Sequence, residues 1–181
     1  GDDGIWAKGG TKASFAVQTT AGNARRELTE QVVQTQLKEA GFDMTIENQK
    51  AGDLFGQILP GGDYQVALYA QVLTSLEPGA CTLFCDKNNP DKNGGSGQNW
   101  QRVLVERAEK DLLALDTELD TNARSTAGKN AMKALAEDAV SLPLDPLPTI
   151  LLWNKKKVVG AVSDNPVLGP LWNVQNWGVT K

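Results

Sequence analysis

Histidine is absent from the 181 residues of this chain. The chain therefore lacks the commonest general base, the commonest metal ligand and the histidine of Ser and Cys triads. Paired acids such as Glu137 and Asp138 remain, but neighbouring residues on a helix point in different directions and do not converge on one atom. The sequence therefore predicts no catalytic residues, no metal site and no cofactor, and favours a protein that is not an enzyme over one that uses paired acids.

Cysteine is scarce, and the two cysteines, Cys81 and Cys85, lie four residues apart. Two thiolates without histidine or a second cysteine pair make a poor zinc site. A local disulfide is one interpretation, and it would indicate an oxidising, exported location. The alternative is a pair of reduced cysteines in a loop that pack as small apolar groups.

Long apolar runs and an excess of positive charge are also missing. No run approaches the ~18 apolar residues of a membrane-spanning helix. The net charge of −4 argues against a nucleic-acid partner, which would need a basic stripe. The one basic run, 155–157, is interpreted as a solvated turn, with an anion-binding patch as the alternative. The start, Gly1-Asp2-Asp3-Gly4, carries no leader, so we expect any targeting segment to lie upstream in a longer protein.

What is present is the composition of a globular domain, with 40% apolar and 22% charged residues. A chain of this length fits one domain, so we predict a single domain over 1–181. Its predicted parts are a strand-helix-strand block at 13–70, a long loop at 73–99, two helices within 100–140, and returning strands with a tail at 141–181.

The first block has the clearest pattern. A strand at 13–19 precedes a helix at 23–40, which Asn23 caps and Gly41 ends. An alternating strand at 42–47, a second helix at 52–59 and an apolar strand at 64–70 follow, and the last is predicted to lie inside the sheet. Such strand-helix-strand units build parallel sheets, which place ligand sites at the strand ends.

The second half is less regular. The stretch 73–99 is long enough for its irregularity to suggest a functional loop. Helical spacing predicts helices at 100–115 and 122–140. Strands are expected at 142–144, 149–153 and 157–160, and the prolines around the first two suggest edge positions. Four tryptophans are predicted to pack in the core or against another lobe: Trp6, Trp153, Trp172 and Trp177.

Five stretches, in order, resemble the motifs of one known family. Residues 37–46 look like its "QLKxxGIxVxL" signature, 62–68 like "GDYDxAL", and 97–100 like "GxNY". Residues 135–144 resemble "LxEDxPxIPL", and Trp172-Asn173 with Trp177 resembles a C-terminal aromatic motif. The family is that of the extracellular solute-binding proteins of ABC importers, family 5, the dipeptide, oligopeptide and nickel type.

The resemblance implies an α/β fold, one lobe of a bilobal periplasmic-binding-protein-like (type II) protein with a mixed, mostly parallel sheet flanked by helices. Family members are longer, and this chain resembles only their C-terminal part. The implied function is capture of a peptide or similar small solute outside the cytoplasmic membrane, periplasmic or lipid-anchored, for delivery to ABC permease subunits. The ligand of such proteins lies between lobes that close on a hinge. The chain would therefore supply half of a cleft, and the missing N-terminal lobe would supply the other half.

The resemblance also indicates site residues. In peptide-binding relatives the "GDYDxAL" strand and the loop after it face the cleft, which makes Tyr69, Gln71 and Thr74 candidates. Asn99 and Trp100 are candidates from the "GxNY" stretch. The structural alternatives are a packed strand aromatic for Tyr69, ordinary loop hydrogen bonds for Gln71 and Thr74, and a hydrophobic staple for Trp100.

Two positions depart from the family pattern. Several members carry an arginine at the position of Leu68 and an aspartate near Thr74, which hold the two ends of a free peptide. A cleft that buries a charged end needs an opposite charge. Conventional capture of free peptide ends is therefore not expected, unless Glu77 supplies the carboxylate.

The resemblance leaves the solute and the role open. Peptides lead on family grounds, and nickel chelates, opines and oligosaccharides remain possible. Direct nickel binding is not expected without histidine. An extracellular solute sensor that is not coupled to transport is the alternative function, because some family members act as sensors.

Overall fold

The structure is a computed structural model that describes residues 3–71, 79–147, 150–165 and 168–180. The chain divides into two compact units. The first comprises Gly1–Gln71 and Thr82–Leu104, and the second comprises Val72–Cys81 and Val105–Lys181. The single domain expected over 1–181 stays a prediction.

The first unit is built on a strand-helix-strand element, as predicted. Strand β3 (Ser14–Gln18) leads into helix α1 (Ala24–Glu39), which is followed by strand β4 (Asp43–Ile46). The side chain of Asn23 accepts a hydrogen bond from the backbone N–H of Arg26, and Gly41 adopts a φ of +87° after the helix. Both predicted signals therefore define the ends of α1, because a side-chain oxygen caps the first turn and glycine tolerates the left-handed turn.

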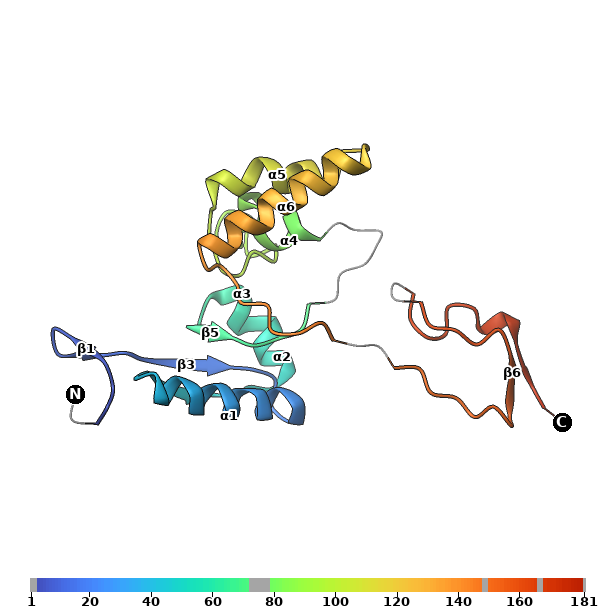
Figure 1. The fold of residues 1–181 in the computed structure, drawn as a ribbon, viewed down its shortest axis with the longest axis horizontal. Helices are drawn as coiled ribbons and strands as arrows, with labels where there is room; N and C mark the ends of the chain where they lie inside the picture. Colours follow the sequence, from blue (N-terminus) through green and yellow to red (C-terminus); the bar gives the residue numbers. More distant parts are fainter. Residues whose placement is uncertain (1–2, 72–78, 148–149, 166–167, 181) are drawn as a thin grey trace. The chain divides into compact units, whose positions relative to one another are not determined.

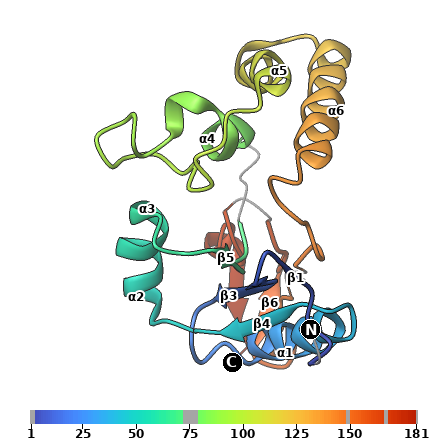
Figure 2. The same ribbon diagram turned by 90° about the vertical axis from the view of Figure 1, so that its left-hand side faces the viewer.

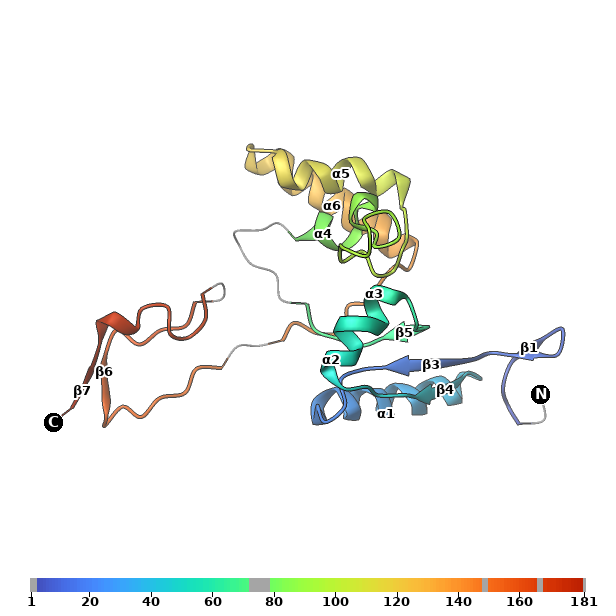
Figure 3. The same cartoon turned by 180° about the vertical axis from the view of Figure 1, so that it is seen from behind.

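Three parallel strands form the sheet of this unit, in the order β4-β3-β5. Val17 of β3 pairs with Ile46 of β4 and with Val66 of β5 (Val66–Ala67). Helix α1 packs against β4 and runs along the strands (Figures 1 and 3). The expectation that 64–70 lies inside the sheet is wrong, because β5 pairs only with β3 among the described residues and Val66 is 43% exposed. The parallel α/β fold itself is confirmed.

The second helical segment spans residues 51–61, close to the prediction of 52–59. It consists of α2 (Ala51–Asp53), a π-helical turn η1 (Leu54–Ile58) and α3 (Leu59–Gly61) (Figure 2). Leu54 and Leu59 are fully buried and anchor the segment. Gly62 ends it at a φ of +81°.

The stretch predicted as a long loop contains two short helices. Helix α4 (Ala80–Phe84) and the 3₁₀ turn η2 (Asp86–Asn88) interrupt it. Both cysteines, Cys81 and Cys85, are disulfide-bonded and fully buried. The irregular-loop prediction is therefore wrong for part of the stretch, since buried apolar side chains at 81, 83 and 85 organise it around a local core.

The second unit contains a pair of helices, α5 (Glu106–Thr117) and α6 (Thr121–Glu137). Asp120 caps α6 by accepting from the backbone N–H of Ala123 at 2.8 Å. The buried side chains of this pair are Ala108, Leu112, Ala127, Ala131, Ala134 and Leu135. Helix α5 starts six residues later than position 100, where we predicted it, because Arg102 holds a φ of +57°, which no right-handed helix accepts. Helix α6 ends at Glu137 rather than 140.

The C-terminal part differs from the prediction more strongly. Residues 142–144 and the described residues 150–153 are not strands, and the prolines nearby leave fewer N–H groups to pair. Strand β6 (Val158–Gly160) pairs antiparallel with β7 (Trp177–Val179), which agrees with the strand expected at 157–160. Residues 155–157 form an exposed turn, as interpreted.

The tryptophans are less buried than predicted. Trp6 is 68% exposed, and Trp153 and Trp172 are also exposed, so these three do not pack in the core. Packing against another lobe stays a prediction. The ring of Trp6 lies over Gly41, and its Nε1 donates a hydrogen bond to the carbonyl of Ala40 at 2.8 Å. The indole is thus held at the end of α1 instead of inside the unit. In the described residues, no helix is long and apolar enough to cross a membrane.

The first residues form a small hairpin between β1 (Ala7–Lys8) and β2 (Thr11–Lys12). A 3₁₀ turn, η3 (Val174–Asn176), precedes β7. Ile5 is the buried apolar side chain of the N-terminal lead-in.

Candidate functional site

The carboxyl end of β5 carries the first of the predicted site residues. Beyond the last sheet pair, the N–H of Leu68 donates to the carbonyl of Gln18 at 2.9 Å. The Thr19 hydroxyl then donates to the carbonyl of Leu68 at 2.5 Å. These two bonds hold the backbone of Leu68 after the strand ends. They therefore fix the point at which the chain reaches Tyr69.

Tyr69 belongs to an aromatic cluster with Phe55 of η1 and Trp100. The ring centroids of Tyr69 and Trp100 lie 5.6 Å apart. Phe55 stands edge-on to Tyr69 at 6.0 Å and lies 6.2 Å from Trp100. These separations are typical of favourable aromatic pairs. The structure thus brings together two of the predicted residues, Tyr69 and Trp100, and adds Phe55.

The polar atoms of this aromatic cluster have no partner in the described residues. Neither the Tyr69 hydroxyl nor Nε1 of Trp100 makes a hydrogen bond there, although both side chains are half-buried. Burial, with a smaller contribution from Tyr64, raises the pKa of Tyr69 to about 12. The Tyr69 hydroxyl therefore stays protonated at neutral pH and can donate a hydrogen bond as well as accept one.

Gln71 is exposed beside this cluster. Its Nε2 lies 3.5 Å from Oε1 of Gln98, which is a long and weak hydrogen bond. A weak bond between two amides is easily exchanged for bonds to another molecule. Gln71 is thus placed to offer both a donor and an acceptor.

Asn99 takes a different place from its neighbours. It is fully buried, and its Nδ2 faces three carbonyls, those of Phe84, Cys85 and Val103, at 3.4, 3.3 and 2.9 Å. The Asn99 amide therefore organises the loop that carries Trp100. Thr74 and Glu77 lie outside the described residues.

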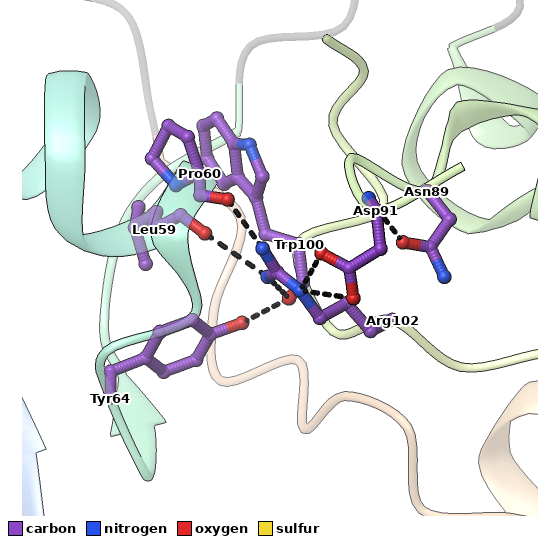
Figure 4. A network of polar contacts seen from close by, with 7 residues as sticks. All are labelled: Leu59, Pro60, Tyr64, Asn89, Asp91, Trp100 and Arg102. Carbon is purple, nitrogen blue, oxygen red and sulfur yellow. Dashed lines mark hydrogen bonds and ion pairs between the residues drawn. The ribbon is translucent and has the colours of Figure 1, made fainter. Parts of the chain in front are cut away.

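Arg102 fixes the loop from the other side (Figure 4). Its Nε lies 3.0 and 3.1 Å from the two carboxylate oxygens of Asp91. Its two terminal nitrogens donate to the carbonyls of Leu59 and Pro60 in the last turn of α3, and to that of Trp100 at 2.9 Å. The guanidinium thus joins a helix end, where a cation is favourable, to the backbone of Trp100.

Tyr64 completes this set of bonds. Its hydroxyl donates to the same carbonyl of Trp100 at 2.8 Å, and the N–H of Asp91 donates to the Asn89 side chain at 3.0 Å. Two donors on one carbonyl hold Trp100 firmly in position. We name Arg102, Asp91 and Tyr64 the Arg102 network.

The sequence did not reveal Phe55 and Arg102 as parts of this site. Phe55 could be assigned to the apolar stripe of its helix, but the face it turns to Tyr69 depends on the π turn. Arg102 has a positive φ that residue type does not predict, because arginine rarely adopts it. Gly62 was the one residue in the sequence that could have indicated the position of Arg102. A Cβ there would lie 3.0 Å from the guanidinium carbon, so the glycine allows its close approach.

The described part of the site is suited to neutral contacts. Its exposed groups are aromatic rings, one hydroxyl and amides, and the Arg102 charge is paired with Asp91. Within the described ranges, no three His, Cys, Asp or Glu side chains are grouped to hold a metal ion. This arrangement can stack on flat or apolar groups and exchange hydrogen bonds with neutral polar ones.

Solved structures share this fold. The chain aligns over 99% of its length with the oligopeptide-binding protein AppA from Bacillus subtilis in complex with a nonapeptide, at a TM-score of 0.75 and 22% identity. The chain shares the fold of ABC solute-binding proteins. The family resemblance of the sequence and its predicted fold class are thereby confirmed at the level of the fold.

Two further solute-binding proteins support this result. The oligopeptide-binding protein of Thermus thermophilus, complexed with a pentapeptide, matches 80% of the chain at a TM-score of 0.68 and 27% identity. NikZ from Campylobacter jejuni, in complex with Ni(L-His), matches 98% at a TM-score of 0.75 and 17% identity. The named structures are binding proteins and not enzymes, in agreement with the non-enzymatic prediction.

The chain spans only part of these solute-binding proteins. It covers 34% of AppA, 26% of the Thermus protein and 36% of NikZ. No family model matches the chain, and no curated protein matches it.

Proposed function

We propose that this chain supplies one half of the solute-binding cleft of an extracytoplasmic ABC importer protein. In this proposal the aromatic cluster and Gln71 contact a peptide or a similar small solute. The observation that carries it is the pair Tyr69 and Trp100 at the carboxyl end of β5, whose polar atoms have no partner in the described residues. Ligands of α/β proteins bind at such strand ends.

The other half of the cleft would come from a missing N-terminal lobe. The chain spans about a third of AppA, and several of its apolar side chains are strongly exposed. They belong to the described residues between α6 and β6: Leu142, Leu144, Leu147, Ile150 and Leu152. Exposed apolar side chains gathered along one stretch indicate a contact surface. The remaining lobe would cover it, and the complete protein would deliver its solute to ABC permease subunits.

The part of the solute that touches this half should be uncharged. Leu68 is neutral, and burial of a charged group beside it would lack an opposite charge. The amide of Gln71 suits the alternating N–H and C=O groups of a peptide main chain, and the three rings suit an apolar side chain. A peptide held by its interior, rather than by its charged ends, satisfies both requirements.

The test uses the longer protein that contains this chain, titrated calorimetrically with penta- and nonapeptides whose ends are either free or blocked. Blocked and free peptides should bind with similar affinity. Trp100→Ala should weaken binding at least tenfold, equivalent to about 1.4 kcal/mol, because one stacking surface is lost. Trp6→Ala is the matched control and should leave binding unchanged, since that exposed tryptophan is held at the end of α1 and is not part of the aromatic cluster. Equal binding by the Trp100→Ala variant and the unaltered protein would refute the proposed site.

A further inference from the structure

A chain of hydrogen bonds runs through the first unit from α1 to the residue before Tyr69. It begins at Glu30, whose side chain is buried with only 1% of the residue exposed. Asn48, just beyond β4, donates its Nδ2 to Oε2 of Glu30 at 2.8 Å. Oδ1 of Asn48 accepts from the backbone N–H of Thr19 at 3.0 Å, and the Thr19 hydroxyl donates to the carbonyl of Leu68 at 2.5 Å.

The direction of each bond in this chain is determined. The backbone N–H of Thr19 can only donate, so the oxygen of the Asn48 amide must face it. The NH₂ group of that amide must therefore face Glu30, which accepts through a carboxylate oxygen. The Leu68 carbonyl can only accept, so the Thr19 hydroxyl must donate. If any single donor in this series of hydrogen bonds were replaced by an acceptor, or any acceptor by a donor, one of the bonds would be lost.

The position of Glu30 is not explained by stability alone. Its Oε1 is buried without a hydrogen-bond partner among the residues that the structure describes, and burial raises the pKa of the carboxyl group. A buried acceptor that lacks a partner destabilises the folded state. The acceptor at Oε2 holds the NH₂ group of Asn48, and the orientation of the Asn48 amide depends on that bond.

We propose that Glu30 is a positioning residue for Tyr69, acting through Asn48, Thr19 and the Leu68 carbonyl. The sheet pairing of β5 with β3 ends at Ala67. Beyond that point the backbone that leads into Tyr69 is held by the Leu68 N–H bond to Gln18 and by the Thr19 hydroxyl bond to the Leu68 carbonyl, and the second of these belongs to the chain of hydrogen bonds from Glu30. The connection between Glu30 and the solute rests on the proposed function, in which Tyr69 contacts the solute. The positioning itself is tested without any solute.

The test exchanges the hydrogen-bond donor and acceptor between Asn48 and Glu30 in the 181-residue chain. Asn48→Asp removes the donor that faces Glu30 and places two carboxyl groups together. Glu30→Gln keeps an acceptor for Asn48. The double variant Glu30→Gln with Asn48→Asp reverses the bond, because the glutamine amide then donates to the introduced carboxylate, whose second oxygen still accepts from the N–H of Thr19.

The readout is the NMR ring signals of Tyr69 in chain labelled at tyrosine. The chain has two tyrosines, so Tyr69→Phe assigns the signals. The rings of Phe55 and Trp100 at 6.0 and 5.6 Å shift these signals strongly. We expect Asn48→Asp to move them toward the values of a free tyrosine, Glu30→Gln to leave them in place, and the double variant to restore them.

Two results would overturn the positioning role. One is an Asn48→Asp variant that melts at a lower temperature but keeps the Tyr69 signals, which would make the hydrogen-bond chain purely structural. The other is a folded double variant that fails to restore the signals. Glu39→Gln, at the exposed end of α1, is the control and should change neither signals nor melting. The Tyr69 signals are measured without peptide. A failure of the proposed solute-binding function would therefore appear in the peptide titrations, and a failure of the positioning role would appear in the Tyr69 signals.

Discussion

Glu30 also makes the stability of the chain depend on pH. Burial is the main cause that raises its pKa, Glu27 raises it further, and the hydrogen bond from Asn48 opposes both. A carboxyl group whose pKa is higher in the folded state binds its proton more tightly there. Its contribution to stability is therefore complete below its ordinary pKa of 4.5, and is lost as the pH rises through the higher folded value.

We therefore expect Glu30→Gln to increase the free energy of unfolding at neutral pH. Glutamine keeps an acceptor for Asn48 and removes the cost of burying a charge. The increase should disappear below about pH 4, where Glu30 is protonated in both states. Urea denaturation at several pH values measures this difference, with Glu39→Gln as the exposed control. A difference of equal size at both ends of the pH range would contradict the explanation.

Gly62 is the second residue whose substitution has a defined outcome. Its φ is +81°, and a Cβ there would lie 3.0 Å from the Arg102 guanidinium. Gly62→Ala should lower the free energy of unfolding by about 1–2 kcal/mol, because alanine is strained in this conformation. Gly56→Ala is the matched control, since Gly56 lies in the helical turn η1 and a Cβ there would meet no atom of another segment within 4 Å. Chemical denaturation should show no loss for Gly56→Ala, and an equal loss in both variants would refute the argument.

At the scale of elements, the Arg102 network joins the end of α3 to the loop before α5. Arg102→Lys should lower the free energy of unfolding by about 2 kcal/mol, because lysine lacks the planar fork that serves Asp91 and the carbonyls together. Arg124→Lys, on the exposed side of α6, is the matched control and should stay within about 0.5 kcal/mol. If the denaturation curves of the two variants coincide, the Arg102 network does not contribute to the free energy of unfolding.

Elements with local signals at both ends were predictable from the sequence. Asn23 caps the start of helix α1 and Gly41 follows its end, so both signals lie within a few residues of the helix. The alternation of apolar residues at 42–47 likewise predicted β4. Tyr69 and Trp100 were reachable only through the family resemblance, because nothing in their local pattern distinguishes a ligand contact from a packed ring.

Elements that depend on distant partners were not predictable. The apolar pattern of Val103 and Leu104 continues that of α5, but Arg102 stops the helix by bonding to α3, over 40 residues earlier. The apolar residues 142–153 resemble strands, yet no paired strand accompanies those that the structure describes. Phe55 faces Tyr69 because of a π turn, for which the sequence carries no evident signal.

At the scale of the molecule, the exposed apolar stretch gives a prediction that distinguishes a fragment from a finished protein. Leu142, Ile150 and Leu152 are 83%, 75% and 86% exposed. Changing all three to serine should leave the free energy of unfolding of the 181-residue chain within about 0.5 kcal/mol and raise its solubility. In the longer protein, the same triple change should lower thermal stability. A lower free energy of unfolding in the 181-residue chain would contradict the exposed position of these side chains. Unchanged thermal stability in the longer protein would contradict a lobe that covers them.

The short pairing of β5 has a consequence for the order in which the first unit forms. Strands β3 and β4 share four register pairs and are separated by a single helix, whereas β5 adds two pairs from further along the chain. Contacts between nearby residues close with a smaller loss of chain entropy and so form earlier. The half of the sheet that carries α1 would thus be assembled first, and the backbone that leads into Tyr69 would be ordered after it. The part of the unit that carries Tyr69 could then open locally while β3, α1 and β4 stay folded.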